Sequence, residues 1–180
     1  MAVLAVRTPE DGLLGALAPL GLGAAAGTAL VVDLDPSGPH YPGAGSLADL
    51  VAEGPRRSDL SPDRKGLAVL RNGGVGANAA GEVLAALEDG WPAVVFRLPG
   101  ITVAGREADL IVHPLVPGGL FQSPLSGTAV FQDLGFRIPA PGPQLPVLGR
   151  STAAALLAGS VPGRSRWVRA WKPAWEGKWG

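Results

Sequence analysis

Length, composition and charge set the first limits on what this chain is. Its 180 residues are 47% apolar, carry a formal net charge of zero, and include 27 glycines, 18 prolines and no cysteine. This apolar content supports a sizeable core, so a largely disordered protein is excluded and one domain with a tail is expected. Zero net charge excludes a general attraction to nucleic acid. The lack of cysteine excludes disulfides and thiolate metal sites and fits a reducing, cytoplasmic compartment.

Two short apolar runs, residues 2–6 and 28–34, open the chain and are typical of buried parallel strands. A short helix is predicted between them, near residues 13–18, and a glycine turn follows it. The uncharged segment 12–32 is long enough to cross a bilayer, but its glycines and Pro19 argue against insertion. The sequence before this segment lacks the basic start of a signal peptide. A spanning or targeting role is therefore not expected.

The middle of the chain continues the alternation of helices and strands. A capping-box pattern at Ser46 predicts a helix that ends at Gly54. Residues 66–70 predict a third apolar strand, and a glycine loop leads to residues 79–88, where apolar side chains recur at helical intervals. A fourth buried strand is expected at residues 93–96.

Beyond these elements the pattern is less regular. Residues 110–112 predict a fifth strand, and no element is predicted for residues 121–143. Residues 146–149 are strand-like, and Ser151 is expected to cap a helix that runs through Ala158.

The repeated order of strands and helices predicts the fold class. Hydrophobic strands that alternate with helices are typical of an α/β fold with a mostly parallel sheet flanked by helices. Residues 1–160 are expected to form this domain, and residues 161–180 a basic, tryptophan-rich tail.

Two strand ends carry a family resemblance. Residues 31–38 read Val-Val-Asp-Leu-Asp-Pro-Ser-Gly and resemble the segment in which ParA/MinD-type P-loop ATPases carry an Asp-x-Asp-Pro sequence. In that family the two aspartates, here Asp33 and Asp35, face magnesium and the attacking water. Residues 90–99 resemble the family's Walker B strand, except that Arg97 stands where the family has an aspartate.

Later strands extend this resemblance over most of the chain. Residues 108–112 and 145–149 are similar to the late strands of the family, so the resemblance covers roughly residues 1–160. It implies a shortened version of the ParA/MinD-like P-loop NTPase fold.

The departures from the family concern its nucleotide site. After the first strand the family carries a glycine-rich loop with a lysine that neutralises phosphate. Here residues 7–12 read Arg-Thr-Pro-Glu-Asp-Gly, and no lysine precedes Lys65. The two acids repel phosphate, the proline lacks an N–H donor, and a guanidinium does not hold magnesium. We therefore expect a degenerate site in which Arg97 forms an ion pair with Asp33 or Asp35.

A second glycine-rich loop, residues 72–79, reads Asn-Gly-Gly-Val-Gly-Ala-Asn-Ala. It resembles the family's phosphate-binding loop with both lysines and both threonines replaced. The amides of Gly73, Gly74 and Gly76 are candidates for weak anion binding at a helix N-terminus. The loop follows the Asp-x-Asp strand instead of preceding it, so an ordinary glycine turn is the favoured interpretation.

The tail carries a regular aromatic pattern. Its tryptophans recur every four residues and alternate with basic side chains; the residues concerned are Trp167, Trp171, Trp175, Trp179, Arg166, Arg169 and Lys172. A spacing of four places the rings on one face of a helix or of a strand, and Pro173 argues against an unbroken helix. The rings are expected to pack back on the domain or to dock on a protein partner or a membrane surface. Single-stranded nucleic acid is the least favoured alternative.

These observations favour a protein without catalysis. No nucleophile or metal motif is found, and the two histidines lack the spacing of metal ligands. The resemblance implies a non-catalytic scaffold or localisation factor without a cofactor, similar to pilus-assembly localisation proteins of the CpaE/TadZ type. It would act on a protein partner such as an intact ATPase or an assembly machine.

Two alternatives to this function stay open. One is a true ATPase that binds ATP and magnesium through a remodelled site, in which Arg7, Arg71 or Arg97 contacts phosphate. The other is a peripheral protein held by its tail at the inner face of the membrane. Nucleic acid is not an expected partner.

Overall fold

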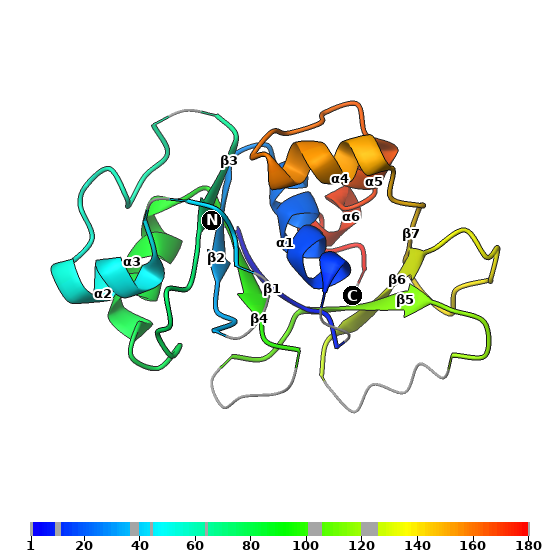
Figure 1. Cartoon of the computed structure of the whole chain (residues 1–180), viewed down its shortest axis with the longest axis horizontal. Coiled ribbons are helices and arrows are strands. Elements are labelled where there is room, and N and C mark those ends of the chain that lie inside the picture. The colour runs from blue at the N-terminus through cyan, green and yellow to red at the C-terminus, as the bar shows by residue number, and fades with distance from the viewer. Residues whose placement is uncertain are drawn as a thin grey trace.

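A seven-stranded parallel sheet forms the centre of the molecule (Figure 1). The computed structural model describes residues 2–9, 12–36, 40–43, 45–63, 65–100, 106–119 and 126–179. The strands are β1 (Ala2–Arg7), β2 (Ala29–Asp33), β3 (Leu67–Leu70), β4 (Ala93–Leu98), β5 (Leu110–Leu115), β6 (Thr128–Asp133) and β7 (Gln144–Leu145). Their order in the sheet is β3-β2-β4-β1-β5-β6-β7, and each neighbouring pair is parallel. The predicted α/β fold with a parallel sheet is confirmed.

Helices cover both faces of this sheet. They are α1 (Leu13–Ala26), α2 (Leu47–Glu53), α3 (Gly81–Gly90), α4 (Arg150–Leu157), α5 (Arg166–Arg169) and α6 (Lys172–Trp175). Figure 1 shows α1 with α4, α5 and α6 on one side of the sheet and α2 with α3 on the other. Each side has its own hydrophobic cluster, because successive residues of a strand point to opposite faces.

The first helix is longer than the sequence predicted. A short helix was expected near residues 13–18, but α1 extends to Ala26 and is buried along most of its length. Glycine lowers helix propensity by about 1 kcal/mol, and burial between the sheet and the tail outweighs that cost. The helix ends at Gly27, whose positive φ of 86° reverses the chain. No helix in the described part of the chain has the length and apolar character to cross a bilayer.

The later elements also differ from expectation. Strand β6 lies within residues 121–143, where no element was predicted, and the last strand is β7 instead of residues 146–149. Its two residues pair with β6, and the carbonyl of Pro146 accepts a hydrogen bond from the Gln132 side chain. The N-cap of α4 is Gly149 and not Ser151, so that helix begins without a side-chain cap.

The N-terminal cap of α2 is the one that the sequence predicted. The Ser46 hydroxyl accepts a hydrogen bond from the Asp49 amide, and the Asp49 carboxylate accepts one from the Ser46 amide at 2.9 Å. These reciprocal bonds satisfy two backbone donors that helix geometry leaves unpaired, so α2 starts at a defined residue.

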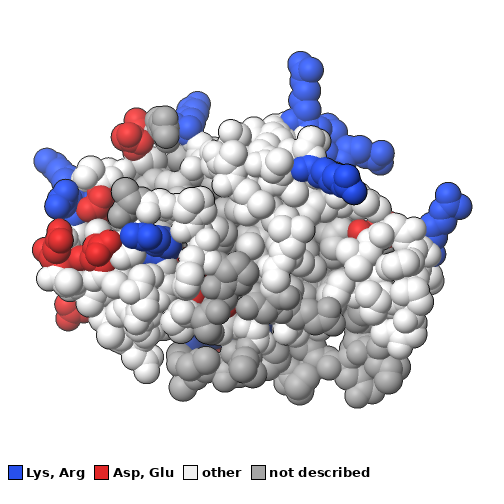
Figure 2. All heavy atoms as spheres, in the orientation of Figure 1, with Lys and Arg blue, Asp and Glu red and all other residues white. Residues whose placement is uncertain are grey.

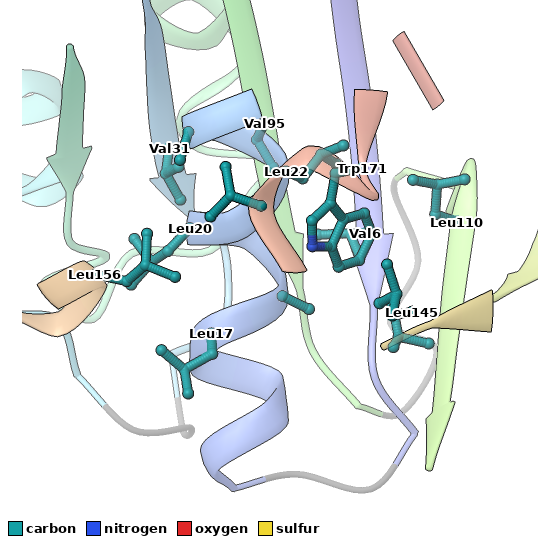
Figure 3. Close-up of a cluster of buried hydrophobic side chains, with 14 of the residues drawn as sticks. Val6, Leu17, Leu20, Leu22, Val31, Val95, Leu110, Leu145, Leu156 and Trp171 are labelled. Carbon is teal, nitrogen blue, oxygen red and sulfur yellow. The ribbon is translucent and has the colours of Figure 1, made fainter. Parts of the chain in front are cut away.

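The tail packs back on the domain and completes its core. Trp167 and Trp171 are 2% and 0% exposed, and Figure 3 shows Trp171 close to Val6 of β1 and Leu145 of β7. The indole N–H of Trp167 donates to Gln132 Oε1 at 2.6 Å, and that of Trp175 donates to the carbonyl oxygen of Leu22 at 2.8 Å.

These contacts bear on the tail residues that were predicted to dock on a partner or a membrane. The rings of Trp167 and Trp171 lie inside the domain, so in this conformation they are not available to a partner or a membrane. Burying two indoles against α1 removes a large apolar area from water and so stabilises the folded domain. The basic side chains Arg166, Arg169 and Lys172 remain exposed, and Trp175 and Trp179 are half-buried.

Charge is unevenly distributed over the surface. Figure 2 shows acidic and basic side chains mixed over the α2 and α3 end of the molecule and mainly basic ones over the opposite end. Between residues 150 and 179 the exposed charged side chains are Arg150, Arg164, Arg166, Arg169, Lys172 and Lys178, with Glu176 as the acid. The neutral chain therefore has a basic region over α4 and the tail.

Candidate functional site at the carboxyl edge of the sheet

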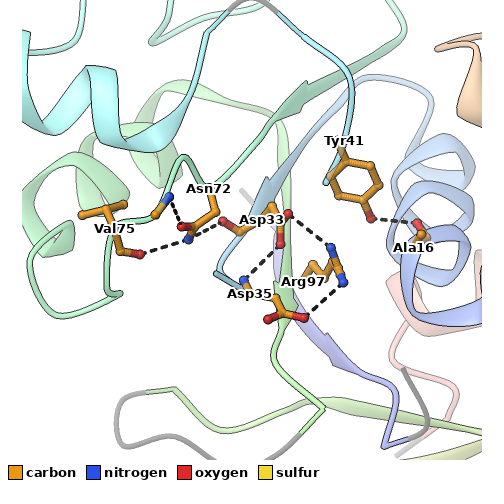
Figure 4. Close-up of polar contacts among 8 residues, drawn as sticks. Ala16, Asp33, Asp35, Tyr41, Asn72, Val75 and Arg97 are labelled. Carbon is orange, nitrogen blue, oxygen red and sulfur yellow. Dashed lines mark hydrogen bonds and ion pairs between the residues drawn. The ribbon is translucent and has the colours of Figure 1, made fainter. Parts of the chain in front are cut away.

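The predicted ion pair is present where β2 and β4 end side by side. Asp33 and Arg97 are register partners in this parallel pair. The two terminal nitrogens of Arg97 contact different carboxylates, Asp33 Oδ2 at 3.2 Å and Asp35 Oδ2 at 3.1 Å (Figure 4). One guanidinium therefore bridges both aspartates of the Asp-x-Asp sequence.

This bridge is buried and supported from several directions. The side chains of Arg97, Asp33 and Asp35 are 2%, 0% and 4% exposed. Asp33 Oδ1 also accepts the backbone N–H of Asp35 at 3.0 Å. The Arg97 guanidinium carbon lies 5.5 Å from the centre of the Tyr41 ring, and the Tyr41 hydroxyl donates to the carbonyl oxygen of Ala16 at 2.7 Å. The surroundings thus hold the guanidinium in place.

Burial changes the proton affinity of this cluster. It raises the pKa of Asp33 from 3.8 to about 6, although the Arg97 charge and the Asp35 amide act in the opposite direction. Burial likewise raises the pKa of the Tyr41 hydroxyl, so the phenol stays protonated as a donor. Desolvation of the Asp33 carboxylate outweighs its ion pair, because a guanidinium shared between two acids compensates each of them incompletely.

The second glycine loop lies beside the same strand end. The Asn72 amide nitrogen donates to the carbonyl oxygens of Asp33 at 3.2 Å and Val75 at 3.0 Å, and its oxygen accepts the Gly74 amide at 2.7 Å. Gly73 and Gly74 have φ values of 77° and 92°, which favour glycine. The loop is thus a glycine turn held by a buried asparagine. The anion-binding role of Gly73, Gly74 and Gly76 stays a prediction.

The segment after β1 has a different chemistry from a phosphate loop. Arg7 is buried, and its Nε–H donates to the carbonyl oxygen of Pro99 at 3.0 Å. Burial lowers the pKa of the Arg7 guanidinium, which nevertheless stays charged near neutral pH. The acids Glu10 and Asp11, which were expected to repel phosphate, lie outside the described residues.

A pocket of about 170 Å³ lies at this edge on the α3 side of the sheet. Apolar side chains of Leu34, Ala77, Leu98 and Pro99 line it, together with the charged side chains of Arg7 and Arg106. Arg7 was a candidate phosphate ligand from the sequence, whereas Arg106 was not among the candidates. The guanidinium of Arg106 contacts Glu88 of α3 and lies 4.1 Å from the centre of the Phe96 ring. No local pattern indicates that contact, because it joins α3, β4 and the segment before β5, which are separate in the sequence.

Other residues considered from the sequence lie elsewhere. Arg71, a candidate phosphate ligand, follows β3, and its backbone forms an isolated parallel β-bridge with that of Ser46. His113 lies in β5, with its ring 5.9 Å from that of Phe131. Within the described ranges, no group of three or more His, Cys, Asp or Glu side chains is arranged to hold a metal ion.

Comparison with solved structures identifies chains of similar fold. The crystal structure of a ParA family ATPase from Chlorobium tepidum TLS matches with a TM-score of 0.64 at 14% identity, over 96% of this chain and 98% of that chain. Cobyrinic acid a,c-diamide synthase from Mycobacterium smegmatis, with bound ADP and magnesium, matches with a TM-score of 0.46 at 16% identity, over 95% of this chain and 91% of that one. No protein-family model and no curated protein matches the sequence. The match to the ParA family ATPase shows that this chain has a ParA-like fold.

Proposed function

We propose that this protein is a non-catalytic ParA-like scaffold or localisation factor. The observation that carries the proposal is the position of Arg97, whose guanidinium bridges Asp33 and Asp35 at the carboxyl edge of the sheet. Those carboxylates are the ones that the family resemblance relates to magnesium. In this protein the guanidinium of Arg97 takes the place of a metal ion between the two carboxylates.

The residues at this edge do not fit ATP with magnesium. Magnesium takes oxygen ligands in near-octahedral geometry and usually keeps several waters. Here an oxygen of each aspartate already contacts Arg97, and the side chains concerned are almost fully buried. In the loop after β1, Pro9 lacks the N–H that a phosphate cradle uses, and no lysine is present in that part of the sequence.

The outer surface of the tail supports a role in protein contacts. The indoles of Trp167 and Trp171 face the core, so the adjacent Arg166, Arg169 and Lys172 are directed to solvent. Arginine is enriched in protein interfaces, and a basic surface speeds association with an acidic partner. In this proposal the docking element is the basic side of the tail, and its partner is an ATPase or an assembly machine of pilus or secretion type.

Nucleotide binding tests the first half of the proposal. Thermal unfolding is measured with and without ATP or ADP in the presence of magnesium, and an intact ParA-type ATPase serves as positive control. We expect no shift for this protein. A nucleotide at about 100 times its dissociation constant would add about 2.7 kcal/mol of stability, so a clear shift for the wild type would contradict the proposal. It would favour the alternative of an arginine-based phosphate site.

Localisation tests the second half. A fluorescent fusion is followed in native cells beside a variant with Arg166→Glu, Arg169→Glu and Lys172→Glu. The matched control reverses two exposed arginines near α2, with Arg56→Glu and Arg57→Glu. We expect discrete positioning that is lost only in the tail variant. Flotation with vesicles of anionic phospholipid separates the alternatives, because binding of purified protein to vesicles would favour the peripheral membrane function.

A further inference from the structure

We infer that the pocket between Arg7 and Arg106 is a binding site for a small organic carboxylate with a compact apolar body. The inference does not rest on the proposed scaffold function. It concerns the α3 side of the sheet, whereas the Arg97 bridge lies toward Tyr41 and α1.

Strand alternation separates the two sites. At the end of β2, Asp33 and Asp35 flank Leu34, and in β4 Arg97 precedes Leu98. Both leucines belong to the hydrophobic cluster under α3, so their side chains point away from the ion pair. The pocket is thus a separate cavity at the carboxyl edge, the edge at which open α/β sheets bind ligands.

Arg106 is positioned as an anion donor by the elements around it. Its guanidinium lies over the ring of Phe96 and contacts Glu88 through one terminal nitrogen. A guanidinium has five N–H donors in a rigid planar group. The contact with Glu88 and the Phe96 ring orient this group, and the contact with Glu88 uses only some of its donors. Arg7 is oriented by its hydrogen bond to the Pro99 carbonyl oxygen and lines the same pocket.

The walls and the volume define the rest of the ligand. Besides the two arginines, the pocket is lined mainly by apolar side chains, among them Leu34, Leu98 and Ala77, and Asn78 is a polar residue of its lining. A volume of about 170 Å³ is below the roughly 300 Å³ at which drug-sized pockets begin, so this pocket suits a small ligand. A carboxylate matches the guanidinium fork with two parallel hydrogen bonds, and a small ring or branched chain matches the apolar walls.

The test uses benzoate as the probe and the full chain as the protein. Binding is followed by two-dimensional NMR on isotope-labelled protein, with benzamide as the uncharged analogue and inorganic phosphate as an anion without an apolar body. We expect benzoate to shift the amides of Leu34, Ala77 and Leu98. Benzamide and phosphate are expected to bind at least about tenfold more weakly, a difference of about 1.4 kcal/mol.

Two variants locate the site. Arg106→Gln removes the charge of one lining residue, and Ala77→Leu fills the cavity without changing charge. If Arg106→Gln is poorly folded, Ala77→Leu still shows whether benzoate binds in this pocket. Each is expected to weaken benzoate binding by about tenfold or more. The control Arg166→Gln changes an exposed arginine of α5 and is expected to bind like the wild type.

Three results would overturn the inference. These are no benzoate shifts in the wild type, equal binding of benzamide or phosphate, and unchanged binding in both pocket variants. A melting shift with ATP and magnesium would contradict the scaffold function and leave the benzoate result as it stands, so the two proposals fail separately.

Discussion

Gly21 of α1 lies against the indole ring of Trp167. A β-carbon at Gly21 would be 2.1 Å from Cζ3 and 2.5 Å from Cη2 of that ring, and 2.8 Å from Nε1 of Trp171. Real β-carbons do not approach other atoms so closely, so only glycine allows the tail to sit at this depth on the helix. Gly21, one of the glycines that made the first helix difficult to predict, is therefore part of its contact with the tail.

Gly21→Ala is expected to destabilise the protein by about 1–3 kcal/mol, because the added methyl group overpacks a buried contact. Urea unfolding followed by tryptophan fluorescence measures the change. Gly81→Ala is the matched control, since a β-carbon at this first residue of α3 meets nothing within 4 Å. Equal stability of the two variants would show that the tail does not pack on α1.

Arg97→Met is expected to cost about 3–5 kcal/mol, because it leaves two buried carboxylates without a cation. The triple variant with Asp33→Asn, Asp35→Asn and Arg97→Met removes the charges together and is expected to recover most of the loss. Chemical denaturation of both variants and the wild type is the measurement. A single variant as stable as the wild type would contradict the buried bridge.

Asp33 is expected to make stability depend on pH. Its pKa is raised from 3.8 to about 6 in the folded protein, so the folded state holds the proton more tightly than the unfolded chain. This contribution is fully present below about pH 4 and is lost as the pH rises through about 6. Asp33→Asn lacks it, so the free energy of unfolding of the variant should rise relative to the wild type by about 3 kcal/mol across that window.

Denaturation at a series of pH values measures this difference, with Asp63→Asn as a control at an exposed carboxylate. If the gap between Asp33→Asn and the wild type stays constant over the window, Asp33 does not titrate as a buried acid.

Asn72→Ala is expected to loosen the turn that follows β3. The substitution removes donors to the carbonyl oxygens of Asp33 and Val75 and the acceptor for the Gly74 amide, and it costs about 1–3 kcal/mol. Hydrogen exchange at the Gly74 amide should accelerate. The Gly135 amide, which donates to the Asp133 carboxylate in a similar turn, is an internal reference that should not change. Unchanged exchange at Gly74 would mean that Asn72 does not hold the turn.

The Arg97 bridge could be predicted from sequence, whereas the tail could not be placed. Strand ends in a parallel sheet meet at one edge, so Asp33 and Arg97 were expected to be neighbours once their strands were recognised. A four-residue spacing of tryptophans fits burial and docking equally well, and the room for the Trp167 ring depends on Gly21 of α1, which lies far away in the sequence.

Strand β6 and the charged pocket were missed for a related reason. The apolar residues of β6 lie between stretches of sequence that contain glycines and prolines, which obscure a strand of six residues. Arg106 precedes a strand as an ordinary charged residue, and only the contacts with Phe96 and Glu88 make it part of a site. Tertiary contacts of this kind leave no periodic signal in the chain.

The tryptophans that pack on α1 lie far from it in the sequence, and this separation affects folding in the cell. The bond from Trp175 to Leu22 joins residues 153 positions apart, and Trp171 fills the same part of the core. During synthesis, α1 therefore emerges long before the side chains that shield it from water. Non-local closure of this kind slows folding and leaves an apolar helix open to aggregation. We expect the nascent chain to depend on a holding chaperone until the last tryptophans leave the ribosome.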